Sequence, residues 1–179
     1  LSKSFSNVTV LKKLNLVFDE SRINCILGPS GCGKTTILNV LASIQTIESG
    51  EIYSDQPYSV SYLFQESRLL SWFNAVDNAM YLMDSKLSLH EKKNYAHALL
   101  QKVGLSGFED HYPDELSGGM ARRVALVRTI AHKSDLLLMD EPFGALDAQT
   151  RSTMQAYLLE IWQNIDITIL FIPHDLDEE

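Results

Sequence analysis

Cysteine is scarce in this chain of 179 residues. Its two cysteines, Cys25 and Cys32, stand seven positions apart, a spacing that fits neither a disulfide framework nor a metal-binding pair of thiols. The sequence therefore argues against a disulfide scaffold or a thiolate metal site, and a reducing cytosol is the expected compartment.

Positive charge and long apolar runs are also lacking. Lys and Arg number 15 against 23 Asp and Glu, a formal net charge of −8 that disfavours a sequence-independent grip on nucleic acid or on an anionic membrane. Apolar runs stop at about five residues, against the roughly twenty that span a bilayer, and the N-terminus has no apolar signal-peptide core. With 45% hydrophobic residues we expect one domain with a sizeable core. Since the chain lacks an initial Met and stops at Asp177-Glu178-Glu179, we expect it to be part of a longer protein.

The most specific motif is a glycine-rich segment between residues 28 and 36. A short apolar run, Ile23 to Leu27, precedes it and a helix-forming run, Thr36 to Ala42, follows it, which is the strand–loop–helix context of the pattern G-x-x-x-x-G-K-[ST]. Glycines let the backbone N–H groups of such a loop point inward, and the helix adds the positive end of its dipole, so polyphosphate binds there. Lys34 is expected to reach the β- and γ-phosphates, Thr35 to bind Mg²⁺ and Thr36 to lie at the α-phosphate. The predicted phosphate-binding residues are Gly28, Pro29, Ser30, Gly31, Cys32, Gly33, Lys34, Thr35 and Thr36.

Polar residues stand at the ends of three expected buried strands. The apolar run Leu136 to Met139 delivers Asp140 and Glu141 at its C-terminal end, the edge where open α/β sheets bind ligands. Asp140 is expected to hold Mg²⁺, through water, and Glu141 to accept the proton of an attacking water. The other two strand-end residues are Gln65, after the run 60–64, and His174, after the run 168–172. Taken alone, each of these two is more often a structural or solvated side chain.

Elsewhere the pattern is mixed. Near alternation predicts antiparallel strands over 8–11 and 14–18, and helical periodicity governs much of the segment from Asn74 onward, including a capping box at Ser88 to Glu91. Ser117, followed by two glycines, predicts the N-cap of another helix with uncovered N–H groups but no nearby lysine. The expected inner stripe of that helix is Met120, Val124, Val127 and Ala131.

Taken in order, these pieces resemble a known family. The order of the pieces matches, over nearly the whole chain, the nucleotide-binding subunit of ATP-binding cassette (ABC) transporters. The segments that carry the resemblance are the phosphate loop, Gln65, the helical insert, Leu116-Ser117-Gly118-Gly119, Asp140-Glu141-Pro142, Ala145-Leu146-Asp147 and His174-Asp175. The resemblance implies an α/β P-loop NTPase with a mostly parallel core sheet, an N-terminal antiparallel β-subdomain and a helical insert. We expect a single ABC ATPase domain over 1–179, divided into a core, 1–66 and 134–179, and a helical subdomain, 67–133.

Several roles follow from the resemblance rather than from the residues alone. It implies that Phe5 stacks on adenine, that Gln65 contacts Mg²⁺ or the attacking water, and that His174 contacts the γ-phosphate. It also implies that Ser117, Gly118 and Gly119 close on ATP held by a second copy of the chain, and it places Asp147 among the nucleotide-binding residues. Expected cofactors are ATP and Mg²⁺. Expected partners are a second ATPase subunit, permease subunits that hold the protein at the cytoplasmic face of the membrane and, indirectly, a solute-binding protein, with no nucleic acid.

The segments Gln65–Trp72 and Met139–Arg151 look like those of importer ATPases for nitrate, sulfonates, taurine or pyrimidine precursors of thiamine. One departure from the family pattern is Met120, where the family usually has Gln, so half of a capping box with Ser117 is missing. Two alternatives stay open: a soluble cassette ATPase of DNA repair or translation, and a non-catalytic nucleotide-binding regulator.

Overall fold

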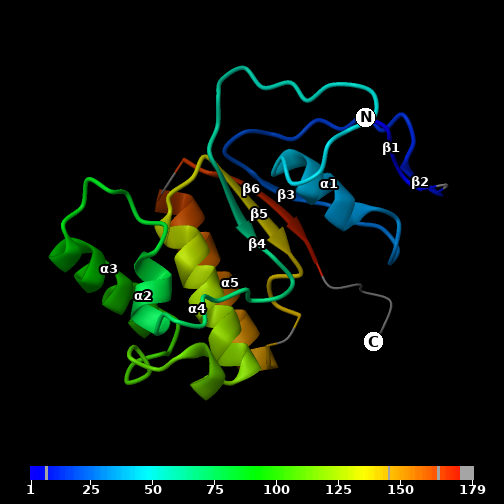
Figure 1. Ribbon diagram of the computed structural model, residues 1–179. Helices are drawn as coiled ribbons and strands as arrows, with labels where there is room; N and C mark the ends of the chain where they lie inside the picture. Colours follow the sequence, from blue (N-terminus) through cyan, green and yellow to red (C-terminus); the bar gives the residue numbers. More distant parts are fainter. Residues whose placement is uncertain (7, 145, 165, 174–179) are drawn as a thin grey trace.

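A parallel sheet lies at the centre of a computed structural model that describes all residues except 7, 145, 165 and 174–179 (Figure 1). Within the described residues it has four strands, in the spatial order β3 (Ile23–Cys25), β6 (Thr168–Ile172), β5 (Leu136–Asp140) and β4 (Val60–Leu63). A separate antiparallel pair consists of β1 (Lys3–Phe5) and β2 (Val8–Leu11). The helices are α1 (Lys34–Leu41), α2 (Ala75–Met80), α3 (Leu89–Lys102), the 3₁₀ helix η1 (Pro113–Glu115), α4 (Gly118–Ala131) and α5 (Ala148–Asn164). The predicted α/β class with its parallel core and antiparallel pair is confirmed.

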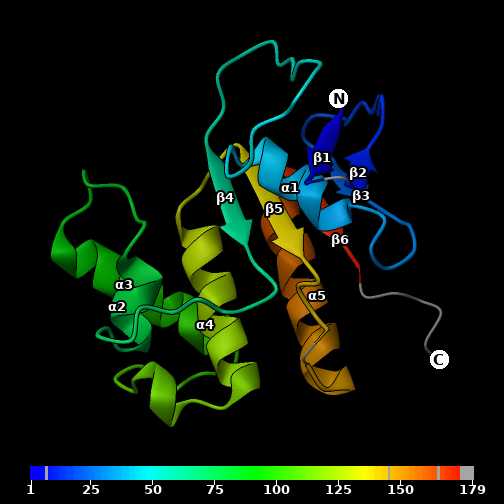
Figure 2. The same cartoon turned by 45° about the vertical axis from the view of Figure 1, so that its right-hand side comes forward.

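The sheet separates two hydrophobic cores. Because successive side chains of a strand point to opposite faces, Leu137 and Met139 of β5 enter one core and Leu138 enters the other. The first core contains apolar residues of α2, α3, α4 and α5, and the second contains Ile37 and Leu38 of α1. Figure 2 shows α4 and α5 on one side of the sheet and α1 on the other. Two-sided burial explains why β5 reads as a continuous apolar run.

One predicted strand is absent from the structure. Residues 14–18 form no strand, and the pair to β2 is provided instead by β1. The first amide of this segment, that of Leu14, donates to the carbonyl of Leu1 over 2.7 Å. Val17 is 89% exposed, so the alternation of apolar residues there does not mark a buried sheet face. The pattern was misleading because pairing depends on a neighbouring strand, which local alternation does not report.

The predicted caps of α3 and α4 are confirmed, but α4 is more extensively buried than a single stripe predicts. Ser88 and Glu91 form the capping box of α3, and Ser117 caps α4 by accepting the amide of Met120 over 3.3 Å, without a reciprocal capping box. However, α4 is not merely striped, because most of its faces are buried. Its buried residues are Arg122, Val124, Ala125, Leu126, Val127, Thr129, Ile130 and Ala131. Such a helix lies inside the protein rather than on its surface.

The division into a core, 1–66 and 134–179, and a helical subdomain, 67–133, stays a prediction. In Figure 1, α2 and α3 lie beside α4, away from α1 and the β1–β2 pair. Among the helices that the structure describes, none combines the length and the apolar character needed to cross a membrane.

The loop that follows β4 is tied to α2 by one buried amide. Asn78 is fully buried, and its Oδ1 accepts the amide N–H of Leu70 over 2.9 Å. Its Nδ2 lies within hydrogen-bonding distance of three carbonyl oxygens, those of Leu70, Phe73 and Asn74, at 3.1, 2.9 and 3.1 Å. The loop therefore owes its shape to a side chain of α2.

We expect Asn78→Ala to lower the free energy of unfolding by about 2–4 kcal/mol, because buried backbone groups lose their partner. Urea denaturation measures this. The matched control is Asn94→Ala, which removes an exposed asparagine of α3 and should change stability by less than about 0.5 kcal/mol. Equal stability of the two variants would show that the amide does not hold the loop.

Candidate active site

A cavity of about 320 Å³ opens at the edge of the sheet where the parallel strands end. Its lining residues are Phe5, Val10, Ser30, Gly31, Gly33, Lys34, Thr35, Thr36, Asp140, Glu141 and Ile172. Residues from the predicted phosphate loop and the predicted acidic pair, which are more than a hundred positions apart in sequence, thus meet in one cavity. This is the edge at which open α/β sheets bind ligands.

The loop requires glycine where it is closest to β2. Gly33 caps α1 with a φ of +99°, a left-handed conformation that disfavours other residues. A Cβ at this position would stand 2.8 Å from Cγ1 of Val10, so β2 packs directly on the loop. Gly31 also has a positive φ, +77°, but there a Cβ would meet nothing within 4 Å. Gly33 thus permits the close approach of β2 to the loop, and Gly31 permits a turn of the loop backbone.

Lys34 is the first residue of α1, and its ammonium group lies over the loop. Nζ donates to the carbonyl of Gly28 and, over 3.1 Å, to that of Pro29. The first N–H groups of a helix have no intrahelical acceptor, and the first turn of α1 contains no acidic residue. The loop side of the cavity therefore presents donors and positive charge, as a polyphosphate requires, and faces the acidic pair on the other side.

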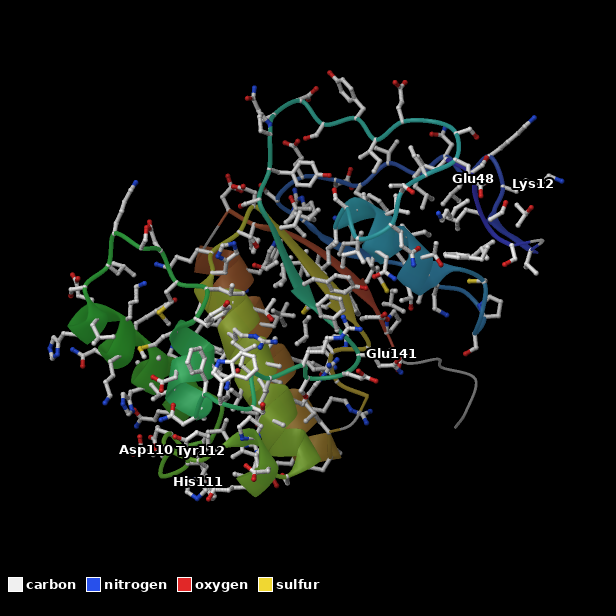
Figure 3. All side chains as sticks on the ribbon, in the orientation of Figure 1. Lys12, Glu48, Asp110, His111, Tyr112 and Glu141 are labelled. Atoms are coloured by element: carbon white, nitrogen blue, oxygen red, sulfur yellow. The ribbon has the colours of Figure 1, made fainter. Side chains whose placement is uncertain are left out.

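The acidic pair lies at the C-terminal end of β5: Asp140 is its last residue and Glu141 the first beyond it. Asp140 is only 4% exposed, and the amide of Glu141 donates to Ile172 over 3.0 Å, which extends the pairing with β6 by one residue. Glu141 has a φ of +46°, an uncommon value for a residue other than glycine. Figure 3 shows Glu141 at the edge of the sheet beyond β5. Such a backbone outlier at the expected position of the base is typical of functional sites.

Gln65 meets Glu141 directly. Its Nε2 donates to Oε2 of Glu141 over 3.1 Å, and both residues lie just beyond the ends of neighbouring parallel strands. The sequence predicted polar side chains at both strand ends, and the structure brings these two together. A side-chain amide in this position orients the carboxylate that faces the cavity.

The residues predicted to bind a metal have suitable chemistry. Thr35 and Asp140 both line the cavity, and they offer a hydroxyl and a carboxylate, oxygen donors of the kind that Mg²⁺ prefers. In the part of the chain that the structure describes, no three His, Cys, Asp or Glu groups come together as a metal cluster. The hydroxyl of Thr35 and the carboxylate of Asp140 fit Mg²⁺, which is commonly held by few protein groups together with substrate phosphates.

Phe5 lies at the rim of the cavity, on β1. Its ring is 41% exposed, and Nζ of Lys3 stands 5.2 Å from the ring centroid. Since β1 pairs with β2 and β2 packs on Gly33, the antiparallel pair carries Phe5 to the phosphate loop. An exposed ring in this position is available for stacking on a planar base.

Several described residues of the predicted site are not in the cavity lining: Gln65, the loop residues Gly28, Pro29 and Cys32, and two further regions, 117–119 and Asp147. Ser117 and Gly118 are exposed at the N-terminus of α4, with Gly119 half-buried, and in Figures 1 and 2 this end of α4 lies far from α1. Asp147 accepts the amide of Thr150 over 2.9 Å and so caps α5. Hydrogen bonds from Thr150, through its side chain and then its backbone, lower the pKa of the Asp147 carboxyl. His174 lies outside the described residues, so its role stays a prediction.

Sequence reasoning missed one residue behind the cavity, Arg122. Arg122 is only 3% exposed, and its guanidinium group donates to the backbone carbonyls of the acidic pair and of Pro142. Burial lowers the pKa of Arg122, while the charges of Asp140 and Glu141 raise it. The available signal was the run of apolar residues after it, which indicates a buried helix.

Fold and site together define a P-loop nucleoside triphosphatase. A family model described as ABC transporter matches residues 11–144. The chain therefore belongs to the ABC transporter family, and it is an ATP-binding, ATP-hydrolysing cassette of that family.

Its relatives include named import ATPases. The chain is 40% identical over 185 residues to the aliphatic sulfonates import ATP-binding protein SsuB of a Bacillus cereus strain, covering 99% of this chain and 72% of SsuB. It is 39% identical over 185 residues to the taurine import ATP-binding protein TauB of Escherichia coli O157:H7, with the same coverage of both chains. Among solved structures, the dimeric post-hydrolysis state of the ATP-binding cassette MJ0796 with ADP and Pi matches with a TM-score of 0.87 and 26% identity, covering 98% of this chain and 85% of that one.

Cys32 gives a chemical probe of the loop. The thiol is exposed, and its Sγ lies 2.9 Å from the position that a Cβ on Gly28 would take, so the side chain lies inside the curve of the loop. We expect a bulky thiol reagent on Cys32 to block nucleotide binding and MgATP to protect the thiol. Mass spectrometry measures the labelling, and Cys25, which is also exposed, serves as the internal reference. Equal labelling of Cys32 with and without MgATP would contradict this loop geometry.

Proposed function

We propose that the cavity binds MgATP and that Glu141 activates the attacking water. In this proposal the phosphate loop, residues 28–36, cradles the phosphates and Lys34 contacts the β- and γ-phosphates. Phe5 stacks on adenine, and Gln65 positions the water or the metal. The observation that supports the assignment is the meeting of the loop and the acidic pair in one cavity, with Gln65 hydrogen-bonded to Glu141.

We propose that Thr35 and Asp140, together with Gln65, are the residues that would hold Mg²⁺. When bound, the metal would neutralise the charge that develops on the transferred phosphoryl group. The protein contributes a hydroxyl and a buried carboxylate to the lining of one cavity. His174 is proposed to contact the γ-phosphate.

We also propose that two copies of the chain form a dimer with two shared sites. Ser117, Gly118 and Gly119 would close on ATP held by the loop of the other copy. In support, this helix N-terminus is exposed and is not part of the cavity of its own chain. Uncovered N–H groups at a helix N-terminus suit a γ-phosphate that arrives with a second molecule. Asp147, whose carboxylate caps α5, is proposed to be one of the nucleotide-binding residues.

The cassette is proposed to drive import of a sulfonate-type solute through separate permease subunits, supplied by a solute-binding protein. The relatives named for sulfonate and taurine import support this solute class. An aromatic cluster supports a permease contact: Trp72, on the loop after Gln65, is 68% exposed and Tyr81, at the C-terminal end of α2, is 57% exposed, and both pack against Phe73. Exposed aromatics of this kind mark interaction sites. The ATPase would then sit at the cytoplasmic face of the membrane without entering it.

Reconstitution tests the transport proposal. The protein is combined in liposomes with the permease and solute-binding protein encoded beside it, and ATP hydrolysis is measured with taurine or an alkanesulfonate, with nitrate and with a thiamine-precursor pyrimidine. Stimulation by the sulfonates alone is expected. Stimulation by nitrate or the pyrimidine instead would change the solute class, and hydrolysis without any permease-dependent uptake would contradict a role in transport.

A further inference from the structure

Arg122 places all five of its N–H donors on backbone carbonyl groups. A guanidinium group has one N–H at Nε and two at each Nη. The acceptors are Pro142 O for Nε at 3.3 Å, Phe64 O and Gln65 O for Nη1, the latter at 2.8 Å, and Asp140 O and Glu141 O for Nη2 at 2.9 and 2.8 Å. No donor is left for any other task, and the side chain is nearly fully buried.

These five carbonyls lie at the ends of β4 and β5 and in the loops that follow them, next to the proposed catalytic residues Gln65 and Glu141. Phe64 and Gln65 follow the end of β4, and Asp140 is the last residue of β5, with Glu141 and Pro142 after it. The strands themselves are paired only as far as Leu63 with Met139, so regular sheet pairing does not fix how the two chains diverge beyond that point. Arg122 reaches them from α4, and its two Nη atoms each take one of the loops.

We propose that Arg122 is a positioning residue that holds Gln65 and Glu141 in the geometry needed for ATP hydrolysis. The inference rests on the proposed roles of those two residues. Glu141 has a φ of +46°, so its peptide groups are held in an uncommon orientation. Arg122 stabilises this orientation by donating a hydrogen bond to the carbonyl of Glu141. With both backbones fixed, the amide of Gln65 and the carboxylate of Glu141 meet at 3.1 Å.

The charge alone does not explain the arrangement. Asp140 and Glu141 present their carbonyls to the guanidinium, and only a planar group with donors on three nitrogens can serve two diverging loops at once. A lysine ammonium at this position would keep the charge but donate from one nitrogen, so it would hold one loop at best. Substitution by lysine therefore separates a positioning role from a simple need for positive charge.

The neighbouring arginine supplies a matched control. Arg123 lies on the same helix, is also partly buried, and donates through Nη1 to Val103 over 2.9 Å and to Gly104 over 3.3 Å, at the end of α3. It touches neither strand end. Arg123 makes three such bonds against five for Arg122, the third from Nε to the carbonyl of Gly119 within α4 over 3.3 Å, and none of its acceptors is Gln65 or Glu141.

The experiment compares Arg122→Met, which keeps the aliphatic stem and removes every donor, with Arg123→Met. For Arg122→Met we expect kcat to fall about 10–100-fold, with KM for MgATP and the affinity for a fluorescent ATP analogue changed less than about threefold, since misplacement of catalytic groups acts mainly on the transition state. Arg123→Met should keep kcat within about threefold of the wild type. Thermal melting is recorded for both variants.

The outcomes separate the possible failures. A kcat of Arg122→Met equal to that of Arg123→Met would overturn the positioning role, whereas absence of hydrolysis by the wild type would refute the proposed function itself. If Arg122→Met does not fold, Arg122→Lys and Arg123→Lys supply the comparison. A lower kcat of Arg122→Lys at unchanged KM then supports the inference, and wild-type kcat in Arg122→Lys overturns it.

Discussion

Replacing Glu141 by Gln is expected to lower ATP turnover roughly 10²–10⁴-fold, because the amide cannot accept the proton of the attacking water. The substitution keeps the size of the side chain, and the new amide oxygen can still accept from Nε2 of Gln65, as the carboxylate does over 3.1 Å. The geometry of the site should therefore survive. The matched control is Glu51→Gln, an exposed glutamate outside the cavity lining, which should leave turnover unchanged.

The same variant should trap a dimer. ATP would remain uncleaved on each phosphate loop, and each γ-phosphate would be bound by the N–H groups at Ser117, Gly118 and Gly119 of the other copy. Neutralising Glu141 also removes a negative charge that faces the phosphate. Light scattering should thus find a dimer in ATP and a monomer in ADP. A monomer in saturating ATP, or a dimer that persists when Ser117→Arg is added, would refute the shared site.

Lys34→Ala is the second substitution with a large expected effect. We expect hydrolysis to fall by about 10²-fold or more, since a positive contact to the transferring phosphoryl group stabilises charge that develops in the transition state. Removing Nζ also frees the carbonyls of Gly28 and Pro29, which the ammonium group binds. Nucleotide affinity is measured alongside turnover to separate the two effects.

Lys12 provides the control for this lysine. It is exposed near the end of β2, and in Figure 3 it lies well away from Glu141. Lys12→Ala should leave both turnover and affinity unchanged. Near-normal turnover of Lys34→Ala would mean that the loop does not hold the transferred phosphate.

The parts of the site that the sequence predicted are those with local signatures. The phosphate loop is one continuous segment, and its glycines are required by its own turns and by the contact with Val10. Asp140 ends, and Glu141 follows, a strand that is buried on both faces and has a continuous apolar run. Both predictions depend on the strand or helix next to the motif rather than on distant contacts, so the sequence alone indicated that these segments lie at strand ends; their roles in nucleotide binding and catalysis stay predictions.

What the sequence could not provide depends on distant pairings. The expected strand over 14–18 has the right alternation, but no neighbouring strand pairs with it within the described residues, and β1 takes the place beside β2. Arg122 is one of two adjacent arginines, and nothing in their order tells which one is buried. That choice is made by the packing of α4 against the ends of β4 and β5, which only the fold reveals.

The position of Asp140 and Glu141 depends on the hydrophobic packing of β5. In β5 the odd- and even-numbered side chains fill separate cores, so a slip of one residue, about 3.3 Å, would send Leu138 and Met139 each into the wrong core. Asp140 ends this strand, and Glu141 follows it. The packing of Leu137, Leu138 and Met139 in the two cores therefore fixes how far Asp140 and Glu141 extend into the cavity. Selection for rapid hydrolysis would then also act on these apolar residues, which are not in the cavity lining.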